Sequence, residues 1–439
     1  MKATAIWLAI SIGAHGATLE VGDGRAYATV AAALAAANSG DTVSVFDGVY
    51  AEDVTLADAG LTLAAADGAA PWIVGRVVVG QSNVTVRGLG IGGWTNANAG
   101  GVHVSGYSGM TVENCSITNA GSASGSGIYT RNGSSHLIRS NTITGCATGV
   151  NVNSGVGSSY ETGIRIVANR IATNHFDGLD IHGRFITISG NEIFRNFDTN
   201  WVATHPDGIQ LIDTTIDGHQ SCQDIWIVRN RIWSHPQNIF GGYYTTNILI
   251  ANNVLWSETG VVSGVDLDAV TTKHIALFSG RDVLIANNTL GRAINSGIYV
   301  SYDAGQASGG IRVTNNIITG IATGGIAVFF GNASDIGGID HNLYYGNGYD
   351  ARIASTYYST VGDFAAATAY EDHGVSGNPL LTAWIPGVGS PAIGAAATLS
   401  EFTDDFTGRV RSAPWDIGAY ESGTTAMAGS ANIGILTFP

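Results

Sequence analysis

Charged residues are scarce in this sequence. Only 12% of its 439 residues are charged, and its 19 basic side chains include just two lysines, Lys2 and Lys273. Coiled coils and most disordered proteins need many charged residues to stay solvated, so both classes are excluded. The 34 acidic residues give a formal net charge of −15, and such a surface repels the phosphate backbone of a nucleic acid. The sequence therefore predicts no nucleic-acid partner.

Cysteines and long apolar runs are scarce as well. The three cysteines, Cys115, Cys146 and Cys222, fit no metal-binding spacing and allow at most one disulfide. Beyond the N-terminus, no apolar run approaches the ~20 residues that a membrane-spanning helix needs. We expect a monomer with a large core and no membrane span.

The first residues are typical of a secretory signal. Lys2 precedes an apolar stretch, Ile6 to Ala14, which is followed by the small residues Gly16 and Ala17. A basic residue, an apolar core and small residues at the cleavage point are the parts of a signal peptide. We predict a signal peptide over residues 1–17 and a secreted or periplasmic protein; the alternative is an ordinary first strand.

Two short motifs recur along the chain. The first has an aliphatic residue, two variable residues, Asn, one variable residue and an aliphatic residue, as in IRSNTI from Ile138. Its Asn falls at positions 141, 169, 191, 230, 253, 288, 316 and 342. The second motif is Gly, aliphatic, variable, aliphatic, as in GLDI from Gly178 and GIQL from Gly208.

Both motifs alternate in the way of strands with one buried face. Short strands that recur twice per ~25 residues are typical of a solenoid whose coils stack at strand spacing. An Asn at the same turn of every coil predicts a ladder of side-chain amides. Like charges would lie ~4.8 Å apart in such a stack, which explains the low charged fraction.

These repeats resemble the right-handed parallel β-helix of the pectate-lyase-like superfamily, so the resemblance implies an all-β solenoid. It covers residues 18–378, including a short N-terminal capping helix from Tyr27 to Asn38. The stretches SPAIGAA from Ser390 and DIGAYE from Asp416 are similar to the closing segment of such proteins, here residues 379–423. Residues 424–439 are polar and small, and we expect a flexible tail.

Ionisable residues concentrate in two copies of the glycine motif. HFDGLDIH runs from His175 to His182 and HPDGIQLI runs from His205 to Ile212. On adjacent coils these copies place histidine over histidine and aspartate over aspartate. The outward candidates are His175, Asp177, Asp180, His182, His205, Asp207 and Gln210. The alternative interpretation is that each Asp-Gly pair only supplies turn chemistry before a strand.

Long insertions flank the same coils and predict the walls of a groove. They contribute Trp201 and Lys273, and nearby coils add Tyr243 and Tyr299. Aromatic side chains in an open groove suit stacking on sugar rings, although each one alone also fits surface packing. Lys273, in the insertion from Ser257, is equally an exposed residue or a desolvated base.

The resemblance implies a polysaccharide as substrate, and we predict a lyase that acts on a uronic-acid-containing polysaccharide by β-elimination. Stacked carboxylates suit Ca²⁺, with Asp177, Asp180 and Asp207 as ligands. His175, His205 or Lys273 is then the base. The alternatives are a glycoside hydrolase with Asp180 and Asp207 as its carboxylate pair, a uronan C5-epimerase, and a non-catalytic surface or phage-type carbohydrate-binding protein. The Asp-Pro-His motif of mannuronan epimerases and the full motif set of polygalacturonases are missing.

Overall fold

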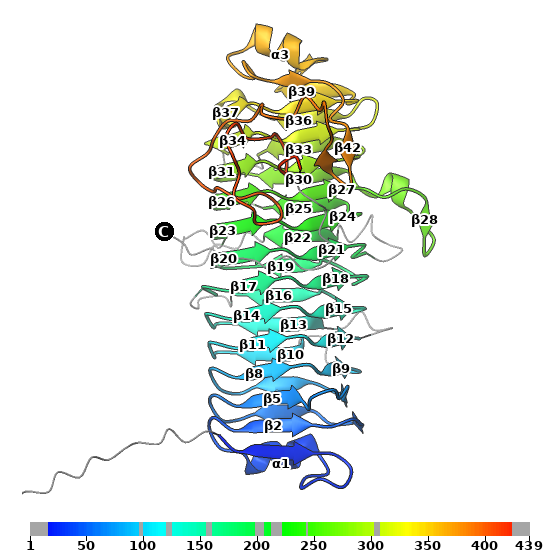
Figure 1. Ribbon diagram of the computed structural model, residues 1–439, viewed down its shortest axis with the longest axis vertical. Helices are drawn as coiled ribbons and strands as arrows, with labels where there is room; N and C mark the ends of the chain where they lie inside the picture. Colours follow the sequence, from blue (N-terminus) through cyan, green and yellow to red (C-terminus); the bar gives the residue numbers. More distant parts are fainter. Residues whose placement is uncertain are drawn as a thin grey trace, which may run out of the picture.

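The chain folds into a parallel β-solenoid in which each coil gives one strand to each of three sheets (Figure 1). The structure is a computed structural model and describes residues 16–95, 100–119, 125–154, 160–197, 206–211, 222–242, 245–302 and 308–423. The predicted tail and nearly all of the predicted signal peptide lie outside these residues. Along the chain the strands follow the order sheet A, sheet B, sheet C, and the order then repeats.

Sheet A turns its aliphatic residues inward, where Ile138, Ile166 and Ile188 stack in register and are fully buried. The alternation follows from the two-residue period of a strand. The strands of sheet A are β1 (Thr18–Val21), β2 (Thr42–Val45), β5 (Thr62–Ala65), β8 (Thr85–Arg87), β11 (Thr111–Glu113), β14 (Leu137–Arg139), β17 (Arg165–Val167), β20 (Arg184–Ser189), β23 (Gln223–Val228), β26 (Thr246–Ala251), β31 (Arg281–Ala286), β34 (Ile311–Thr314) and β37 (Ile336–Asp340).

Sheet B follows sheet A after a two-residue turn and stacks Ile117, Ile143 and Ile171 inside. Its strands are β3 (Val49–Tyr50), β6 (Trp72–Val74), β9 (Gly90–Gly92), β12 (Ser116–Thr118), β15 (Thr142–Thr144), β18 (Arg170–Ala172), β21 (Glu192–Phe194), β24 (Arg231–Trp233), β27 (Val254–Trp256), β32 (Thr289–Leu290), β35 (Ile317–Thr319), β38 (Leu343–Tyr345) and β41 (Val375–Ser376).

Sheet C completes each coil and stacks Ile128, Val150 and Leu179 inside. Its strands are β4 (Val54–Leu56), β7 (Val77–Val79), β10 (Gly100–Ser105), β13 (Ser126–Arg131), β16 (Val150–Asn153), β19 (Leu179–Ile181), β22 (Asp207–Leu211), β25 (Gln237–Gly241), β30 (Lys273–Phe278), β33 (Ser296–Ser301), β36 (Ile326–Phe330), β39 (Tyr349–Ile353) and the antiparallel β40 (Thr356–Tyr358).

The turn between sheets A and B holds the predicted asparagine ladder. In each coil one residue with positive φ, such as Ser140 at 55°, is followed by the buried Asn. The Nδ2 of Asn141 donates to Oδ1 of Asn169 at 3.0 Å, and the same bond recurs from Asn169 to Asn191. The ladder continues to Asn342, whose Nδ2 donates to Glu371 at 2.7 Å. These bonds satisfy buried polar groups that parallel coils would otherwise leave unpaired.

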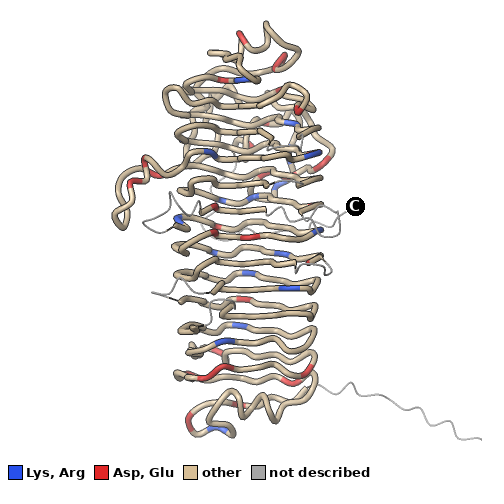
Figure 2. The backbone as a smooth tube through the Cα atoms, turned by 180° about the vertical axis from the view of Figure 1, so that it is seen from behind, with Lys and Arg blue, Asp and Glu red and all other residues tan. Residues whose placement is uncertain are grey.

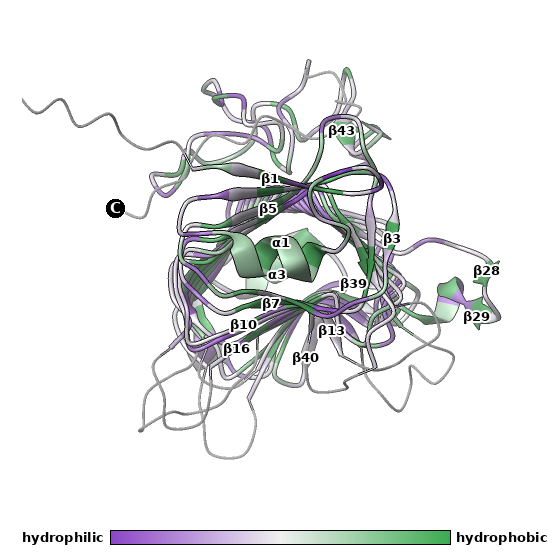
Figure 3. Ribbon diagram, turned by 90° about the horizontal axis from the view of Figure 1, so that it is seen from below, coloured by the Kyte–Doolittle hydropathy of each residue, from purple (hydrophilic) through white to green (hydrophobic). Residues whose placement is uncertain are grey.

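Helices cover both ends of the solenoid, as Figure 3 shows in a view along its axis. The predicted capping helix is the shorter α1 (Val30–Ala36), whose first turn is capped by the hydroxyl of Thr29. The last coil is covered by α3 (Val361–Ala367), which buries Val361 and Phe364. These caps shield coil ends whose backbone groups would otherwise be unpaired.

The C-terminal segment, residues 379–423, packs along the outside of sheets A and B (Figures 1 and 3). It holds the short hairpin of β42 (Leu381–Thr382) and β43 (Ile385–Pro386). Its Phe402 and Trp415 cover Leu249 and Leu284 of sheet A. A second hairpin, β28 (Val261–Val262) and β29 (Val265–Asp266), projects from the solenoid beside the 3-10 helix η1 (Leu267–Ala269); another 3-10 helix, η2 (Ala333–Asp335), precedes β37.

Charged residues are sparse along the coils, and most of the tube in Figure 2 is uncharged. This agrees with the 12% charged fraction of the sequence. In the described part of the chain, no helix combines the length and the apolar character that a membrane crossing requires.

Candidate functional site

The outward side chains of sheet C form a column along the solenoid axis, which we call the Asp180 column. Asn151, Asp180 and Gln210 follow one another in register on β16, β19 and β22. Tyr129 precedes them and Phe240 follows them. The Nδ2 of Asn151 donates to Oδ2 of Asp180 at 2.9 Å and fixes the carboxyl in this column.

A second column, the Asp–Lys column, lies just upstream on the same coils. The backbone N–H of Asp207 donates to Oδ1 of Asp177 at 2.7 Å, so these two carboxyls occupy adjacent coils. Asp207 is in register with Gln237, and Gln237 is in register with Lys273. We refer to Asp177, Asp180, Asp207 and Lys273 together as the Asp–Lys site.

Burial shifts every titratable group of the Asp–Lys site toward its neutral form. Desolvation raises the pKa of Asp177 to about 7 and raises the pKa of Asp180 well above its usual value, an effect that the charge of Asp177 increases. Desolvation likewise raises the pKa of Asp207, with Asp177 raising it further and Lys273 opposing the shift. The pKa of Lys273 is lowered by desolvation, which the charge of Asp207 opposes. All four shifts favour the neutral form of the group, and such perturbed groups on one face are typical of a functional site.

Four oxygen atoms of the two columns have no hydrogen-bond partner among the described residues. They are Oδ1 of Asn151, Oδ1 of Asp180, Oδ1 of Asp207 and Oε1 of Gln237, and all four are buried. A buried oxygen that accepts no hydrogen bond destabilises the folded state unless a ligand, an ion or a water molecule binds to it. The donor set contains only oxygen, which is what Ca²⁺ prefers.

Aromatic side chains continue the columns toward the C-terminal end of the solenoid. The rings of Phe240 and Phe278 lie 5.6 Å apart, and Phe278 lies 5.7 Å from Tyr299. Tyr299 stacks on Phe329 at 4.6 Å, and the guanidinium of Arg352 lies 4.9 Å from the Phe329 ring. We call Phe240, Phe278, Tyr299 and Phe329 the aromatic stripe. The Nζ of Lys273 is 5.0 Å from the Tyr299 ring, so Lys273 lies between this stripe and the carboxyls.

The structure brings together six of the predicted site residues: Asp177, Asp180, Asp207, Gln210, Lys273 and Tyr299. The prediction that Lys273 lies in a loop is wrong, because Lys273 is the first residue of β30 and is half-buried. Pairing with Gln237 of β25 draws this residue into the sheet.

Of the three predicted histidines, the structure describes His175 and His182. In the described part of the chain, the ring of His175 makes no hydrogen bond to the carboxyls; only its backbone N–H is engaged, by the carbonyl of Cys146. His182 is buried at the other end of β19, and desolvation lowers its pKa to about 4. His205, Trp201 and Tyr243 lie outside the described residues.

Gln237 was missed by the sequence analysis, although a signal for it exists. The stretch HPQNIF from His235 repeats the spacing of HPDGIQ from His205, which places Gln237 over Asp207. Gly208 is replaced by Asn238 in that repeat, so the glycine motif does not detect the coil. His235 is fully buried and hydrogen-bonded to Asn196 and Asn238, and desolvation lowers its pKa to about 3.

A second group of possible metal ligands lies near the C-terminal end of the solenoid. Oδ2 of Asp340 is 3.1 Å from Nδ1 of His341 and 2.9 Å from Nδ1 of His373. The two imidazole rings are stacked at 4.4 Å with nearly parallel planes. Both Nδ1 atoms meet the same carboxylate oxygen of Asp340, so this group forms a hydrogen-bonded contact between β37 and the segment after α3.

Known proteins resemble this chain in fold. The family model of the right-handed beta helix region matches residues 74–232, and no curated protein matches the sequence. Pectate lyase Pel9A aligns over 92% of this chain and 97% of its own, with 17% identity and a TM-score of 0.48. DFA-IIIase from Arthrobacter chlorophenolicus A6 in complex with GF2 aligns over 72% and 89%, with 12% identity and a TM-score of 0.49. A mutant of the periplasmic alginate epimerase AlgG aligns over 72% and 74%, with 14% identity and a TM-score of 0.41. Similarity this low leaves the reaction open.

The predicted fold is confirmed by the arrangement of the strands and by the family match. Three parallel sheets stack coil on coil, and the matched region spans coils from β6 to β24. The chain is a right-handed parallel β-helix protein.

Proposed function

We propose that this chain is a secreted or periplasmic polysaccharide lyase that cleaves a uronic-acid-containing polysaccharide by β-elimination. The observation that carries the proposal is the Asp–Lys site itself. It holds three carboxyls on two adjacent coils and, two coils further on, Lys273, the one lysine of the whole sequence beyond Lys2. Elimination beside a carboxylate needs a base and a means of neutralising that carboxylate, and this site offers both.

The aromatic stripe supports a polymeric substrate. The stripe and the two columns run across the coils, so a bound chain would lie along the solenoid axis. From Asp180 to Arg352 the column crosses six strand spacings, or about 29 Å at ~4.8 Å each. Flat aromatic faces pack on the apolar faces of sugar rings, and Arg352 is placed to bind an anionic group at the far end.

The partnerless oxygens support a calcium ion at the site. Asp177, Asp180 and Asp207 would hold it, with Gln237 as a further oxygen, and the buried oxygens of Asp180 and Asp207 that lack a donor support this ligand set. In the described part of the chain the three carboxyls do not all come within 4.8 Å of one another, so binding would draw their side chains together. When bound, Ca²⁺ would neutralise the uronate carboxylate and acidify the adjacent C5 hydrogen. It would also allow the three carboxyls to be ionised together, which burial alone opposes.

Lys273 is the proposed base. Its lowered pKa increases the share of neutral amine, which can accept the C5 proton. The electron pair of the broken C5–H bond forms a double bond between C4 and C5. The bond between C4 and the glycosidic oxygen then breaks, and the leaving oxygen takes a proton from water. The reaction needs no oxidant or reductant.

A hydrolase is the second candidate, and the raised pKa of Asp180 favours it. A carboxyl with a raised pKa can act as a general acid, and Asp207 would then be the base for water. In that case Lys273 would bind substrate, and cleavage would release reducing ends without a double bond.

A turnover screen separates these candidates. Wild type, Asp180→Ala and the exposed control Asp67→Ala would be incubated with polygalacturonate, alginate, xylan and galactomannan, with calcium and with EDTA. We expect ultraviolet-absorbing unsaturated product from an acidic polysaccharide, lost in EDTA and in Asp180→Ala and retained in the control. Reducing ends without absorbance would show a hydrolase. A change of sugar without cleavage would show an epimerase, and binding without any product would show a carbohydrate-binding protein.

A further inference from the structure

A groove on the outer face of sheet A lies away from the Asp–Lys site. It has a volume of about 530 Å³, within the range of ligand sites, and it is lined by β20, β23, β26, β31 and β34 with one wall from the C-terminal segment. Sheets A and C form different faces of the solenoid (Figure 3), so this groove is separate from the site described above.

Two columns of side chains define the groove. The first holds residues with positive φ from four successive coils: Phe185, Asp224, Asn247 and Asp282. The second holds the outward residues in register beside them: Trp226, Leu249, Leu284 and Arg312. The groove therefore has an apolar floor and a rim of oxygen-bearing side chains that repeats from coil to coil.

The aromatic end of the groove is exposed. Phe185 has 46% of its surface exposed, which is unusual for a large apolar side chain, and Trp226 lies on the neighbouring coil. The positive φ of Phe185, 54°, is unfavourable for an aromatic residue, whereas Asp and Asn at the same position of the next coils tolerate it. An exposed ring at a position where Asn would fit better is consistent with a role in binding.

The charges of the groove select against an anionic ligand. Asp224, Asp282 and Glu401 face a single base, Arg312, which is already paired with Glu401 at 2.6 Å. The Nδ2 of Asn247 already donates to Oδ1 of Asp224, and the remaining carboxylate and amide oxygens of the rim can accept hydrogen bonds from hydroxyl groups. A peptide cannot add to the sheet here, because all five strands already pair on both sides.

We propose that this groove is a second carbohydrate-binding site, which takes a neutral glycan. Sugar rings pack on Phe185 and Trp226, and their hydroxyls donate to Asp224, Asn247 and Asp282. The rim repeats at the ~4.8 Å spacing of the coils, which suits a chain of sugar units that lies along the axis. This site is independent of the proposed lyase activity, because it shares no residue with the Asp–Lys site.

The test uses affinity electrophoresis in gels that contain galactomannan, xylan or hydroxyethyl cellulose, with polygalacturonate and alginate as acidic comparisons. The variant is Phe185→Asn, which removes the ring and keeps a residue type suited to the positive φ. Tyr345→Ala is the matched control, since it removes an exposed ring, 43% exposed, from sheet B. Asp180→Ala reports on the sheet C site, and melting curves check that each variant is folded.

We expect at least one neutral glycan to retard the wild type, Asp180→Ala and Tyr345→Ala. Phe185→Asn should bind about tenfold more weakly, the loss of roughly 1.4 kcal/mol for one aromatic contact. No retardation in any neutral gel, or equal retardation of Phe185→Asn, would overturn the proposal. Binding of labelled polylysine that is lost in Phe185→Asn would assign the groove to a basic peptide and also overturn it. Loss of lyase activity in the screen above would leave these outcomes unchanged.

Discussion

At the scale of single residues, the same acidic group serves different purposes inside and outside the coils. Asp177, Asp180 and Asp207 face outward, where a bound cation or substrate can contact their carboxyl oxygens. Glu161 is fully buried and lies 3.8 Å from the Nε2 of His136, which is buried as well. Desolvation raises the pKa of Glu161 to about 7 and lowers the pKa of His136 to about 4, so the pair is neutral in mildly acidic solution.

The raised pKa of Glu161 predicts a stability that falls as the pH rises. Between about pH 4.5 and pH 7 the folded state holds a proton that the unfolded state has lost, so the free energy of unfolding decreases across this range. For Glu161→Gln we expect the pH 5 to pH 8 decrease to shrink by on the order of 2 kcal/mol. Urea unfolding at both pH values measures it, with the exposed Glu20→Gln as control. An unchanged decrease would show that Glu161 is already ionised at pH 5.

The sequence predicts the aspartates of the site better than the lysine. Asp177 and Asp207 sit in coils that carry the glycine motif, where Gly208 is required because a Cβ would lie 2.5 Å from the carbonyl oxygen of Asn238. The next coils replace this glycine by Asn238 and His274, whose side chains hydrogen-bond to each other at 2.9 Å. Because these coils lack the glycine, the Gly-aliphatic-variable-aliphatic motif does not detect them. Lys273 therefore could not be assigned to a strand from the motif alone.

At the scale of elements, the asparagine ladder ties each coil to the next. Asn230 is fully buried; it accepts from the N–H and the Nδ2 of Asn191 and donates to Oδ1 of Asn253. Its replacement therefore leaves the backbone N–H and one Nδ2 hydrogen of Asn191 without an acceptor, while Oδ1 of Asn253 keeps only the backbone N–H of residue 230. The motif made this ladder predictable, since the same Asn recurs at every turn between sheets A and B.

Asn230→Ala tests the ladder at its middle. We expect the free energy of unfolding to fall by about 3 kcal/mol, because several buried polar groups lose their partners at once. Thermal and urea unfolding provide the measurement. Asn295→Ala, at an exposed position, should change stability by less than about 0.5 kcal/mol. Equal effects of the two variants would refute a structural role of the ladder.

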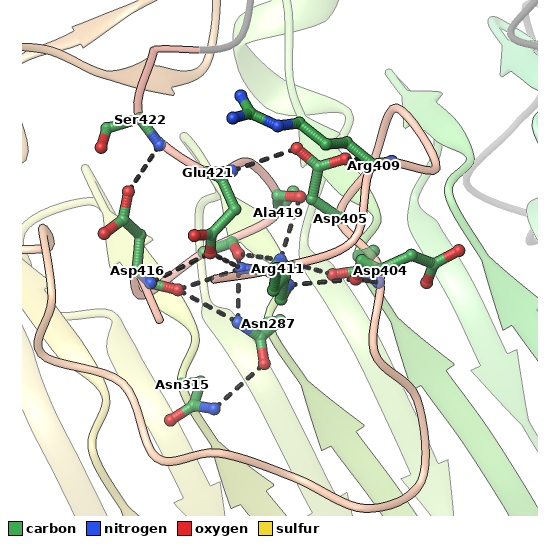
Figure 4. Close-up of polar contacts among 12 residues, drawn as sticks. Asn287, Asn315, Asp404, Asp405, Arg409, Arg411, Asp416, Ala419, Glu421 and Ser422 are labelled. Atoms are coloured by element: carbon green, nitrogen blue, oxygen red, sulfur yellow. Dashed lines mark hydrogen bonds and ion pairs between the residues drawn. The ribbon is translucent and has the colours of Figure 1, made fainter. Parts of the chain in front are cut away.

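The C-terminal segment is a second element whose attachment depends on few residues (Figure 4). Arg411 is buried and donates to Oε1 of Glu421 at 2.7 Å and to Oδ1 of Asn252 at 2.7 Å. Its remaining donors reach backbone carbonyls of the same segment, including that of Gly418 at 2.9 Å. The sequence resemblance predicts such a segment, but not that it packs along the side of the solenoid, because its contacts join distant residues, such as Arg411 and Asn252, which are 159 positions apart.

Arg411→Met should release this segment while the coils stay folded. The change removes the charged partner of the buried Glu421 carboxylate, a loss of about 3–5 kcal/mol that is confined to the segment. We expect new proteolytic cleavage within residues 379–423, mapped by mass spectrometry, with an unchanged circular dichroism spectrum of the sheets. Arg409→Met, an exposed residue of the same loop, is the control. Cleavage that is the same in both variants would contradict the role given to Arg411.

At the scale of the whole molecule, the net charge of the protein and the charge of the proposed substrate are both negative. A charge of −15 repels a polyanion at long range, while the proposed site would bind it at short range. Salt at 0.1 M reduces the screening length to about 10 Å, so the repulsion weakens before the contacts in the groove do. The coils themselves follow from the repeats, whereas the loops and insertions that set the substrate do not repeat and could not be predicted.

This repulsion predicts an unusual salt dependence. We expect KM for an acidic polysaccharide to fall by about two- to fivefold between 10 mM and 100 mM sodium chloride at constant calcium, with little change in kcat. Initial rates at several substrate concentrations measure it. A KM that rises with salt would indicate that a local basic surface steers the substrate and that the net charge is irrelevant.

The most direct test of the account is the rate at which Lys273→Met forms ultraviolet-absorbing product, compared with the wild type and the exposed control Arg281→Met. The wild type and the control should give unsaturated product at a rate that rises with pH as the amine of Lys273 becomes neutral. Lys273→Met should lose at least about a thousandfold in rate, because it keeps the stem of the side chain and removes the base. Full activity of Lys273→Met, or product without absorbance from the wild type, would contradict the assignment of Lys273 as the base of a β-elimination.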